Sequence, residues 1–104
     1  MGEESGAGMS IRRVERGGTV RLVLEGELDI ATAPLLARAI GHERAQDRPV
    51  TVDLARLRFM DSCGLRELLR AASEDPGFRI AGDTGAVRRV IDLCGVREQF
   101  VVAA

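Results

Sequence analysis

The sequence has few aromatic residues and lacks one kind of cation. It contains no Trp, no Tyr and no Lys, and only three Phe among its 104 residues, so all 15 cationic side chains are Arg. With a net charge of -1, it has neither the basic surface nor the stacking side chains that nucleic-acid binding needs. The composition, 45% hydrophobic and 30% charged, is that of one globular domain, and we expect no nucleic-acid partner.

Long hydrophobic runs are also absent. No uninterrupted apolar stretch approaches the roughly 18 residues that cross a bilayer, and "MGEESGAGMS" at the start has neither the basic nor the apolar region of a signal peptide. We therefore expect a cytoplasmic protein with no membrane partner. The first ten residues are small, polar and rich in glycine, which predicts a flexible tail over residues 1–10 ahead of a domain over residues 11–104.

The residue types that carry most enzyme chemistry are scarce. Cys63 and Cys94 form no CxxC pair, and His42 is the only histidine, expected on a polar helix face. There is no Walker loop and no GxGxxG pattern, and Ser62 lacks the glycine of a nucleophile elbow because Met60 stands there. We expect no enzyme activity, no metal and no cofactor.

The hydrophobic pattern predicts alternating strands and helices. Two extended runs around Gly17 and Gly18 indicate a hairpin, and "VTVDL", "FRIAG" and "FVV" indicate three further strands. Helices are expected over 32–45, behind the start signal of Thr32 and Pro34, from Ser62 to before Pro76, and over 84–95. Strands separated by helices predict an α/β sandwich with a mixed, mostly parallel sheet of 4–5 strands and about 3–4 helices.

Each predicted helix has one apolar face. The third helix would begin at Thr84 and end at Gly95. The side chains at helical spacing are Leu36, Ala39, Ile40 and Glu43 in the first helix and Leu65, Leu68, Leu69 and Ala72 in the second. In the third helix, Val87, Val90, Ile91 and Cys94 are expected to point inward.

Two short motifs follow strands and precede helices. They are "GELD" over residues 26–29 and "DSCG" over residues 61–64. Because the carboxyl ends of parallel strands meet at one edge of a sheet, where partners and ligands usually bind, we expect the two motifs to lie side by side.

Ser62 and its neighbours allow two interpretations. Either Asp61 or Ser62 caps the helix, a contribution of about 1 kcal/mol, or the exposed hydroxyl is a site of modification. Gly64 costs up to about 1 kcal/mol relative to Ala inside a helix and adds no cap, which indicates that the backbone or active site of another protein approaches closely there. Asp29 also allows two interpretations: it caps the helix that follows it, or it binds a partner.

Three stretches of the sequence together resemble a known family. "VRLVLEGELDIATAPLL", "VTVDLARLRFMDSCGLRELLRA" and "RRVIDLCGVREQF" are similar to the STAS domain of anti-sigma factor antagonists, over about residues 11–102. The family pattern of an aspartate, a phosphorylatable serine, a small hydroxyl residue, a glycine and an aliphatic residue corresponds to Asp61, Ser62, Cys63, Gly64 and Leu65. Cys63 departs from the pattern, which leaves Ser62 as the only hydroxyl of the motif.

The resemblance implies a phosphorylation-controlled partner switch. The unphosphorylated protein would bind an anti-sigma factor that is also a serine kinase and so release a sigma factor, phosphorylation of Ser62 would end that binding, and a phosphatase would restore it. It would act as a monomer or weak dimer. The alternative is a STAS scaffold or regulatory module of a stress-signalling or transporter complex without direct sigma-factor control. The residues expected to contact the partner are Asp29, Asp61, Ser62, Cys63, Gly64 and Arg66.

Overall fold

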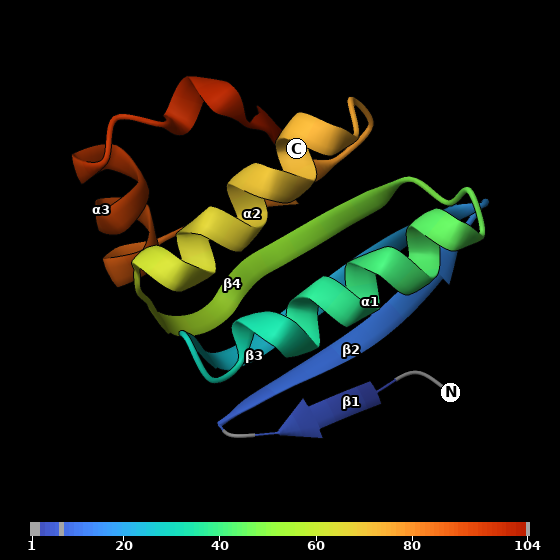
Figure 1. Ribbon diagram of the computed structural model, residues 1–104, viewed down its shortest axis with the longest axis horizontal. Helices are drawn as coiled ribbons and strands as arrows, with labels where there is room; N and C mark the ends of the chain where they lie inside the picture. Colours follow the sequence, from blue (N-terminus) through green and yellow to red (C-terminus); the bar gives the residue numbers. More distant parts are fainter. Residues whose placement is uncertain (1–2, 7, 104) are drawn as a thin grey trace.

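A computed structural model describes residues 3–6 and 8–103 and shows one sheet with helices packed against it (Figure 1). The strands are β1 (Glu3–Gly6), β2 (Met9–Arg16), β3 (Thr19–Leu28), β4 (Val50–Met60), β5 (Arg79–Ala81) and β6 (Val101–Val102). The helices are α1 (Ala33–Ala45), α2 (Ser62–Glu74), α3 (Gly85–Leu93) and the short 3₁₀ helix η1 (Arg97–Gln99). The predicted α/β class is confirmed.

The order of the strands in the sheet follows the order in the chain. β1, β2 and β3 are antiparallel neighbours, whereas β3, β4, β5 and β6 are parallel neighbours. The predicted hairpin is confirmed: Gly17 and Gly18 form its turn with φ of +60° and +84°, values that favour glycine, and Arg16 pairs with Thr19. The sheet has six strands, one more than the upper estimate of 4–5.

The sixth strand comes from the segment expected to be a flexible tail. Glu3–Gly6 pairs with β2, whose first residue, Met9, is buried in the core. The prediction of a flexible tail over residues 1–10 is therefore wrong for these strands, while residues 1, 2 and 7 lie outside the described part. The segment Glu3–Gly6, with the sequence EESG, has no alternation of apolar residues that would indicate a strand, which explains the error.

β4 continues six residues beyond the predicted strand over residues 50–54. Its register against β3 shifts twice, between the pairs Val23↔Asp53 and Glu25↔Arg56 and again after Gly26↔Leu57. Each shift inserts an extra residue in β4, as a β-bulge does. The bulges carry β4 past the end of its apolar alternation to Met60, directly before Ser62.

The helices cover one face of the sheet and share one core. α1 and α2 lie side by side over the sheet (Figure 1), and right-handed crossovers between successive parallel strands place consecutive helices on the same face. Among the inward predictions, Leu65, Leu68, Val87 and Ile91 are buried, and the half-buried Leu69, Ala72 and Val90 pack against the same cluster. In the described part of the chain, no helix is long and apolar enough to span a membrane.

Two details of the third helix differ from the prediction. Thr84 precedes α3, but its side chain makes no capping hydrogen bond. Cys94, expected inward, is exposed; it is the C-cap residue of α3, one position beyond the last helical residue, Leu93.

Candidate functional site

The two motifs after β3 and β4 meet at the carboxyl edge of the sheet. Leu28 pairs with Met60 in the parallel register, and the Asp61 N–H donates a hydrogen bond to the Leu28 carbonyl at 3.2 Å. The expectation that the motifs over residues 26–29 and 61–64 lie side by side is confirmed. This edge therefore presents residues from two loops that are about 30 positions apart in the sequence.

Asp61, and not Ser62, caps α2. Asp61 has an extended backbone, and its Oδ1 accepts a hydrogen bond from the Gly64 N–H at 3.0 Å. Its carbonyl also accepts from the Leu65 N–H at 3.0 Å. Such a cap satisfies N–H groups that have no partner within the helix.

The Ser62 hydroxyl is thereby left available. Ser62 is exposed in the first turn of α2, and no hydrogen bond of its hydroxyl occurs with any residue that the structure describes. Cys63, the next residue, is half-buried with a free thiol. The capping role that the sequence left open for Ser62 is filled by its neighbour.

Gly64 is required by a contact inside the protein. A Cβ added at this position would lie 2.6 Å from Leu28 Cγ and 2.7 Å from the Leu28 carbonyl oxygen, distances at which the atoms would have to move. Gly64 is buried. The interpretation that the glycine makes room for another protein is therefore corrected, because the end of β3 occupies that room.

Hydrogen bonds within the loop hold Asp29 in place. Its Oδ1 accepts from the Ala31 N–H at 3.0 Å and from the Thr32 N–H at 3.1 Å. The buried Thr32 hydroxyl accepts from the Asp29 N–H at 2.8 Å and donates to the Glu27 carbonyl at 2.8 Å. Asp29 therefore shapes the turn before α1, and it is half-exposed directly after Leu28, whose carbonyl binds the Asp61 N–H.

Two exposed apolar side chains flank this edge and were missed in the sequence. Ile30 is 72% exposed and lies two residues beyond the carbonyl that binds Asp61, and Phe59 is 46% exposed and lies two residues before Asp61. Single exposed apolar residues are common, but an exposed isoleucine and an exposed phenylalanine within two residues of Leu28 and Asp61 suit a protein-binding surface. The sequence did contain one indication: Ile30 is an apolar residue in a predicted loop, where it belongs neither to the alternation of a strand nor to the apolar face of a helix.

The charges near Ser62 are few and mostly engaged. Glu27 and Arg58 form a long ion pair at 4.0 Å, and the carboxylates of Asp29 and Asp61 accept backbone hydrogen bonds. Arg66 is exposed on α2 and forms no ion pair with any described residue. No cluster of three or more His, Cys, Asp or Glu within the described residues is arranged to hold a metal ion.

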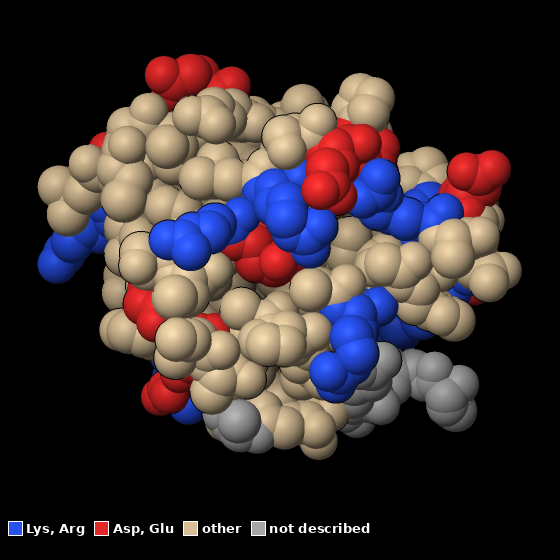
Figure 2. Space-filling model, in the orientation of Figure 1, with Lys and Arg blue, Asp and Glu red and all other residues tan. Residues whose placement is uncertain are grey.

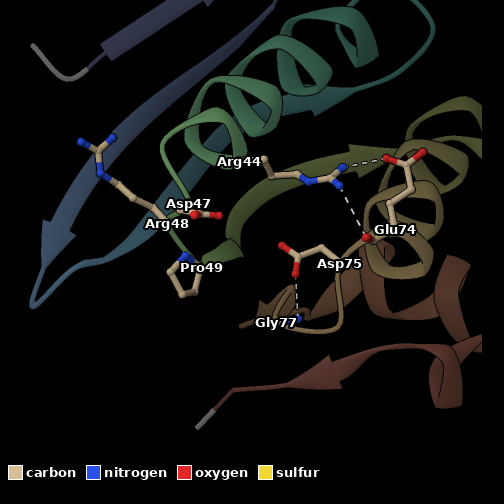
Figure 3. A pocket seen from close by; sticks show the side chains of 7 residues that line it. All are labelled: Arg44, Asp47, Arg48, Pro49, Glu74, Asp75 and Gly77. Atoms are coloured by element: carbon tan, nitrogen blue, oxygen red, sulfur yellow. Dashed lines mark hydrogen bonds and ion pairs between the residues drawn. The ribbon is translucent and has the colours of Figure 1, made fainter.

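The opposite end of the sheet contains a polar cavity of about 270 Å³ between the ends of α1 and α2. Its groups are bonded to one another (Figure 3): Arg44 donates to Glu74 Oε1 at 2.7 Å, and the Gly77 N–H donates to Asp75 Oδ1 at 2.9 Å. Arg48 points away from the cavity centre (Figure 3). Arg44, Arg48, Glu74 and Asp75 in the lining are thus already paired, whereas the Asp47 carboxylate makes no hydrogen bond or ion pair with any described residue.

A buried carboxylate near this end anchors α1 to β2. Glu43, only 2% exposed, accepts hydrogen bonds from Arg13 at 2.5 and 3.1 Å and from Arg48 at 3.1 Å. The hydrogen bond from Arg13 lowers the pKa of Glu43 despite its burial, and the same bond raises the pKa of Arg13. Glu43 thus lies on the same buried face of α1 as Leu36, Ala39 and Ile40.

The sequence matches one family and two named relatives closely enough to assign it. Residues 11–103 match the family model described as "Mlab, STAS domain". Over 98 residues the chain is 33% identical to the anti-sigma-F factor antagonist RsfB of Mycobacterium tuberculosis. The aligned region covers 88% of this chain and 79% of RsfB. An anti-sigma factor antagonist from Mycobacterium paratuberculosis is 30% identical, with a TM-score of 0.81 over 90% of this chain and 84% of that one.

A third protein shares the fold at lower identity. The anti-sigma factor antagonist SpoIIAA in its unphosphorylated form is 23% identical, with a TM-score of 0.74 over 90% of this chain and 88% of the other. The family match over nearly the whole chain, the identity to RsfB and the arrangement of strands and helices agree. This chain belongs to the STAS domain family, which includes anti-sigma factor antagonists.

Proposed function

We propose that this protein is an anti-sigma factor antagonist and that phosphorylation of Ser62 switches off its binding to an anti-sigma factor. The observation that carries the proposal is the exposed, unbonded Ser62 hydroxyl in the first turn of a capped helix. The relatives at 33% and 30% identity are both named as antagonists of anti-sigma factors, which supports the choice of partner. The protein is then a binding partner and substrate, not an enzyme.

The binding surface in this proposal is the carboxyl edge of the sheet. Ile30 and Phe59 supply apolar area, and Ser62, Cys63 and Arg66 supply groups that a partner can bind by hydrogen bonds or charge. Asp29 and Asp61 add carboxylate oxygens while holding their loops. Gly64 contributes by position only, because it seats the start of α2 against Leu28.

The modification is a phosphoryl transfer in which this chain is the acceptor. The Ser62 Oγ attacks the γ-phosphorus of ATP held by the anti-sigma factor, ADP leaves, and the hydroxyl proton passes to a base of the kinase. A phosphatase reverses the modification by hydrolysing the phosphate ester. Each phosphate adds about -1.5 to -2 charges at neutral pH directly beside Asp61.

The phosphate acts by blocking the surface and not by changing the fold. Leu65 and Leu68 are buried in the core behind Ser62, and each contributes roughly 1.5 to 3 kcal/mol to the free energy of folding. A surface phosphate does not overcome that anchoring. At a protein interface, however, an unpaired and desolvated charge costs several kcal/mol, and about 2.8 kcal/mol already lowers affinity a hundredfold.

The test uses the chain with its anti-sigma factor and ATP. Intact-mass analysis should show one added phosphoryl group on the native protein and on Ser73→Ala, and none on Ser62→Ala. Ser73 is the matched control because it is also an exposed serine of α2, with a hydroxyl that already donates to the Arg70 carbonyl at 2.9 Å.

Calorimetry then measures binding of the two forms. We expect the phosphorylated protein to bind at least about a hundredfold more weakly, with an unchanged circular dichroism spectrum. A phosphoryl group on Ser62→Ala would contradict the assignment of the site. Equal affinity at full phosphate occupancy would contradict the switch and favour a scaffolding role in another complex.

A further inference from the structure

The structure restricts where a phosphate on Ser62 can find a partner. The N–H group that a helix cap normally offers, that of Gly64, is already bonded to Asp61 Oδ1 at 3.0 Å, and the Leu65 N–H is bonded to the Asp61 carbonyl. The Asp61 carboxylate beside the phosphate is itself negative. The Ser62 and Cys63 N–H groups of the same turn remain for the phosphate but carry no full charge, so a cation that pairs with it must come from a side chain.

Arg66 is the cation at the right spacing. It follows Ser62 by four residues, so the two side chains leave the same face of α2 with Cβ atoms about 5 to 6 Å apart. Both residues are exposed. A guanidinium can donate two hydrogen bonds to one phosphate, and its reach spans this distance.

The next arginine along the helix is not available in the same way. Arg70 donates to Glu67 at 2.5 Å and to Glu74 at 3.1 Å, and Glu74 also accepts from Arg44 of α1 at 2.7 Å. These pairs form a band of basic and acidic atoms across the face of α1 and α2 (Figure 2). In the described part of the chain Arg66 takes no part in any ion pair.

The other charged groups near the start of α2 do not compete for this role. Asp29, in the loop after β3, and Asp61 are anionic and engaged with backbone N–H groups. Arg58 of β4 pairs with Glu27 at 4.0 Å. The Cys63 side chain, half-buried, is the remaining titratable group in the first turn.

We propose that Arg66 is the residue that binds a phosphate on Ser62, through an ion pair across one turn of α2. The inference rests on the proposed function in that it takes Ser62 as the modified residue. It adds a second effect of the modification: the same event that places a negative charge on the binding surface also withdraws the cation of Arg66 from the partner. The switch then changes two groups of the surface at once.

The test installs phosphoserine at position 62 during translation, without any kinase, and follows the phosphorus NMR signal against pH. Arg66 should stabilise the dianion and so lower the second pKa of the phosphate. We expect this pKa to rise by about 0.5 unit in Arg66→Gln, the size expected for an exposed ion pair. Arg66→Lys should retain part of the shift, because it keeps the charge and loses the planar guanidinium.

Arg70→Gln is the matched control, since it removes an arginine of the same helix that is already paired with two glutamates. It should leave the phosphate pKa unchanged, and 0.5 M salt should reduce the difference between the native protein and Arg66→Gln. In addition, the Arg66 Nε–H resonance should shift on phosphorylation. An equal phosphate pKa in the native protein and Arg66→Gln, with no change at this resonance, would overturn the proposal.

The outcomes of this test and of the functional test are separate. A failed titration removes Arg66 as the phosphate-binding residue and leaves phosphorylation by the anti-sigma factor intact. Absence of phosphoryl transfer, or unchanged partner affinity, removes the proposed function but does not alter the titration, because the phosphate there is installed independently.

Discussion

The two ends of the parallel strands use charged residues in different ways. At the amino end, Glu43 is buried and bonded to two arginines, and Arg44 and Glu74 pair across α1 and α2. At the carboxyl end, Asp29 and Asp61 bond to backbone N–H groups of their own loops. The ion pairs at the amino end of β3 and β4 thus join β2, α1 and α2, whereas the two aspartates after β3 and β4 shape their own loops. The carboxyl end has ion pairs as well, the long Glu27–Arg58 pair and, beyond β5, the pair of Asp83 with Arg97 at 2.6 Å.

This difference separates stability from binding. Groups that are paired with one another at the amino end have little left to offer a partner, even around a cavity of about 270 Å³. At the carboxyl end, the Asp29 and Asp61 side chains accept hydrogen bonds from backbone N–H groups. Ser62, Arg66 and Ile30 remain exposed on the elements that these bonds stabilise. A protein surface that must bind, and be modified, needs such unpaired groups on rigid elements.

The largest expected effect is a loss of stability at the carboxyl end, where the start of α2 packs against the end of β3. Gly64→Ala should lower the free energy of unfolding by about 2 to 3 kcal/mol, because the new Cβ would meet the Leu28 carbonyl and side chain. Denaturant unfolding measures this loss. The start of α2 must also shift, so partner affinity should fall in the same variant.

Gly41→Ala is the control for helix propensity. Gly41 lies inside α1, and a Cβ there would have no atom within 4 Å, so the substitution should stabilise the protein by about 0.5 to 1 kcal/mol. If both alanine variants gained stability, the close contact between Gly64 and Leu28 would be refuted.

The second effect tests the amino end. Glu43→Gln should lower the free energy of unfolding at pH 7 by about 2 kcal/mol. This is less than the 3 to 5 kcal/mol for breaking a fully buried pair, since Arg13 and Arg48 are each about a quarter exposed and keep contact with Glu15. Affinity for the partner should stay the same, because the substitution lies at the far end of the sheet.

The pH dependence of the same variant provides a further check. The pKa of Glu43 is lowered in the folded protein, so its contribution is present above the ordinary glutamate pKa of about 4.3 and is lost as the pH falls through the folded value. The stability difference between the native protein and Glu43→Gln should therefore shrink below about pH 4. A constant difference from pH 7 to pH 3 would argue against the ion pair as its source.

The smallest effect sharpens the comparison at the binding surface. Ile30→Ser should weaken anti-sigma factor binding about tenfold, equivalent to about 1.4 kcal/mol, while changing the free energy of unfolding by less than about 0.5 kcal/mol. Ile30 is 72% exposed, so the substitution removes little contact within the folded protein itself. Calorimetry and denaturant unfolding report the two quantities.

Val102→Ser is the matched control, an exposed apolar residue on the edge strand β6. It should leave affinity unchanged. A loss of affinity equal to that of Ile30→Ser would show that the partner covers far more than the carboxyl edge of the sheet.

Local patterns were sufficient to predict most elements of the fold. The three helices have apolar side chains at helical spacing, the hairpin has its two glycines, and the order of strands and helices implies parallel pairing. The position of Ser62 at a junction between strand and helix follows from the same patterns. These features depend on neighbours within a few residues, which is the range over which a sequence pattern is informative.

Other features depend on contacts between distant parts of the chain. The need for glycine at position 64 comes from Leu28, the capping residue Asp61 is held by a hydrogen bond to the Leu28 carbonyl, and β4 shifts register twice against β3 before Met60. In the same way, β1 is a strand because β2 offers it a backbone edge. The sequence by itself determined which helices and strands form and where Ser62 lies in the chain. Only the tertiary structure decided which side chains are bonded inside the protein and which remain exposed, because those bonds depend on distances between residues that are far apart in the sequence.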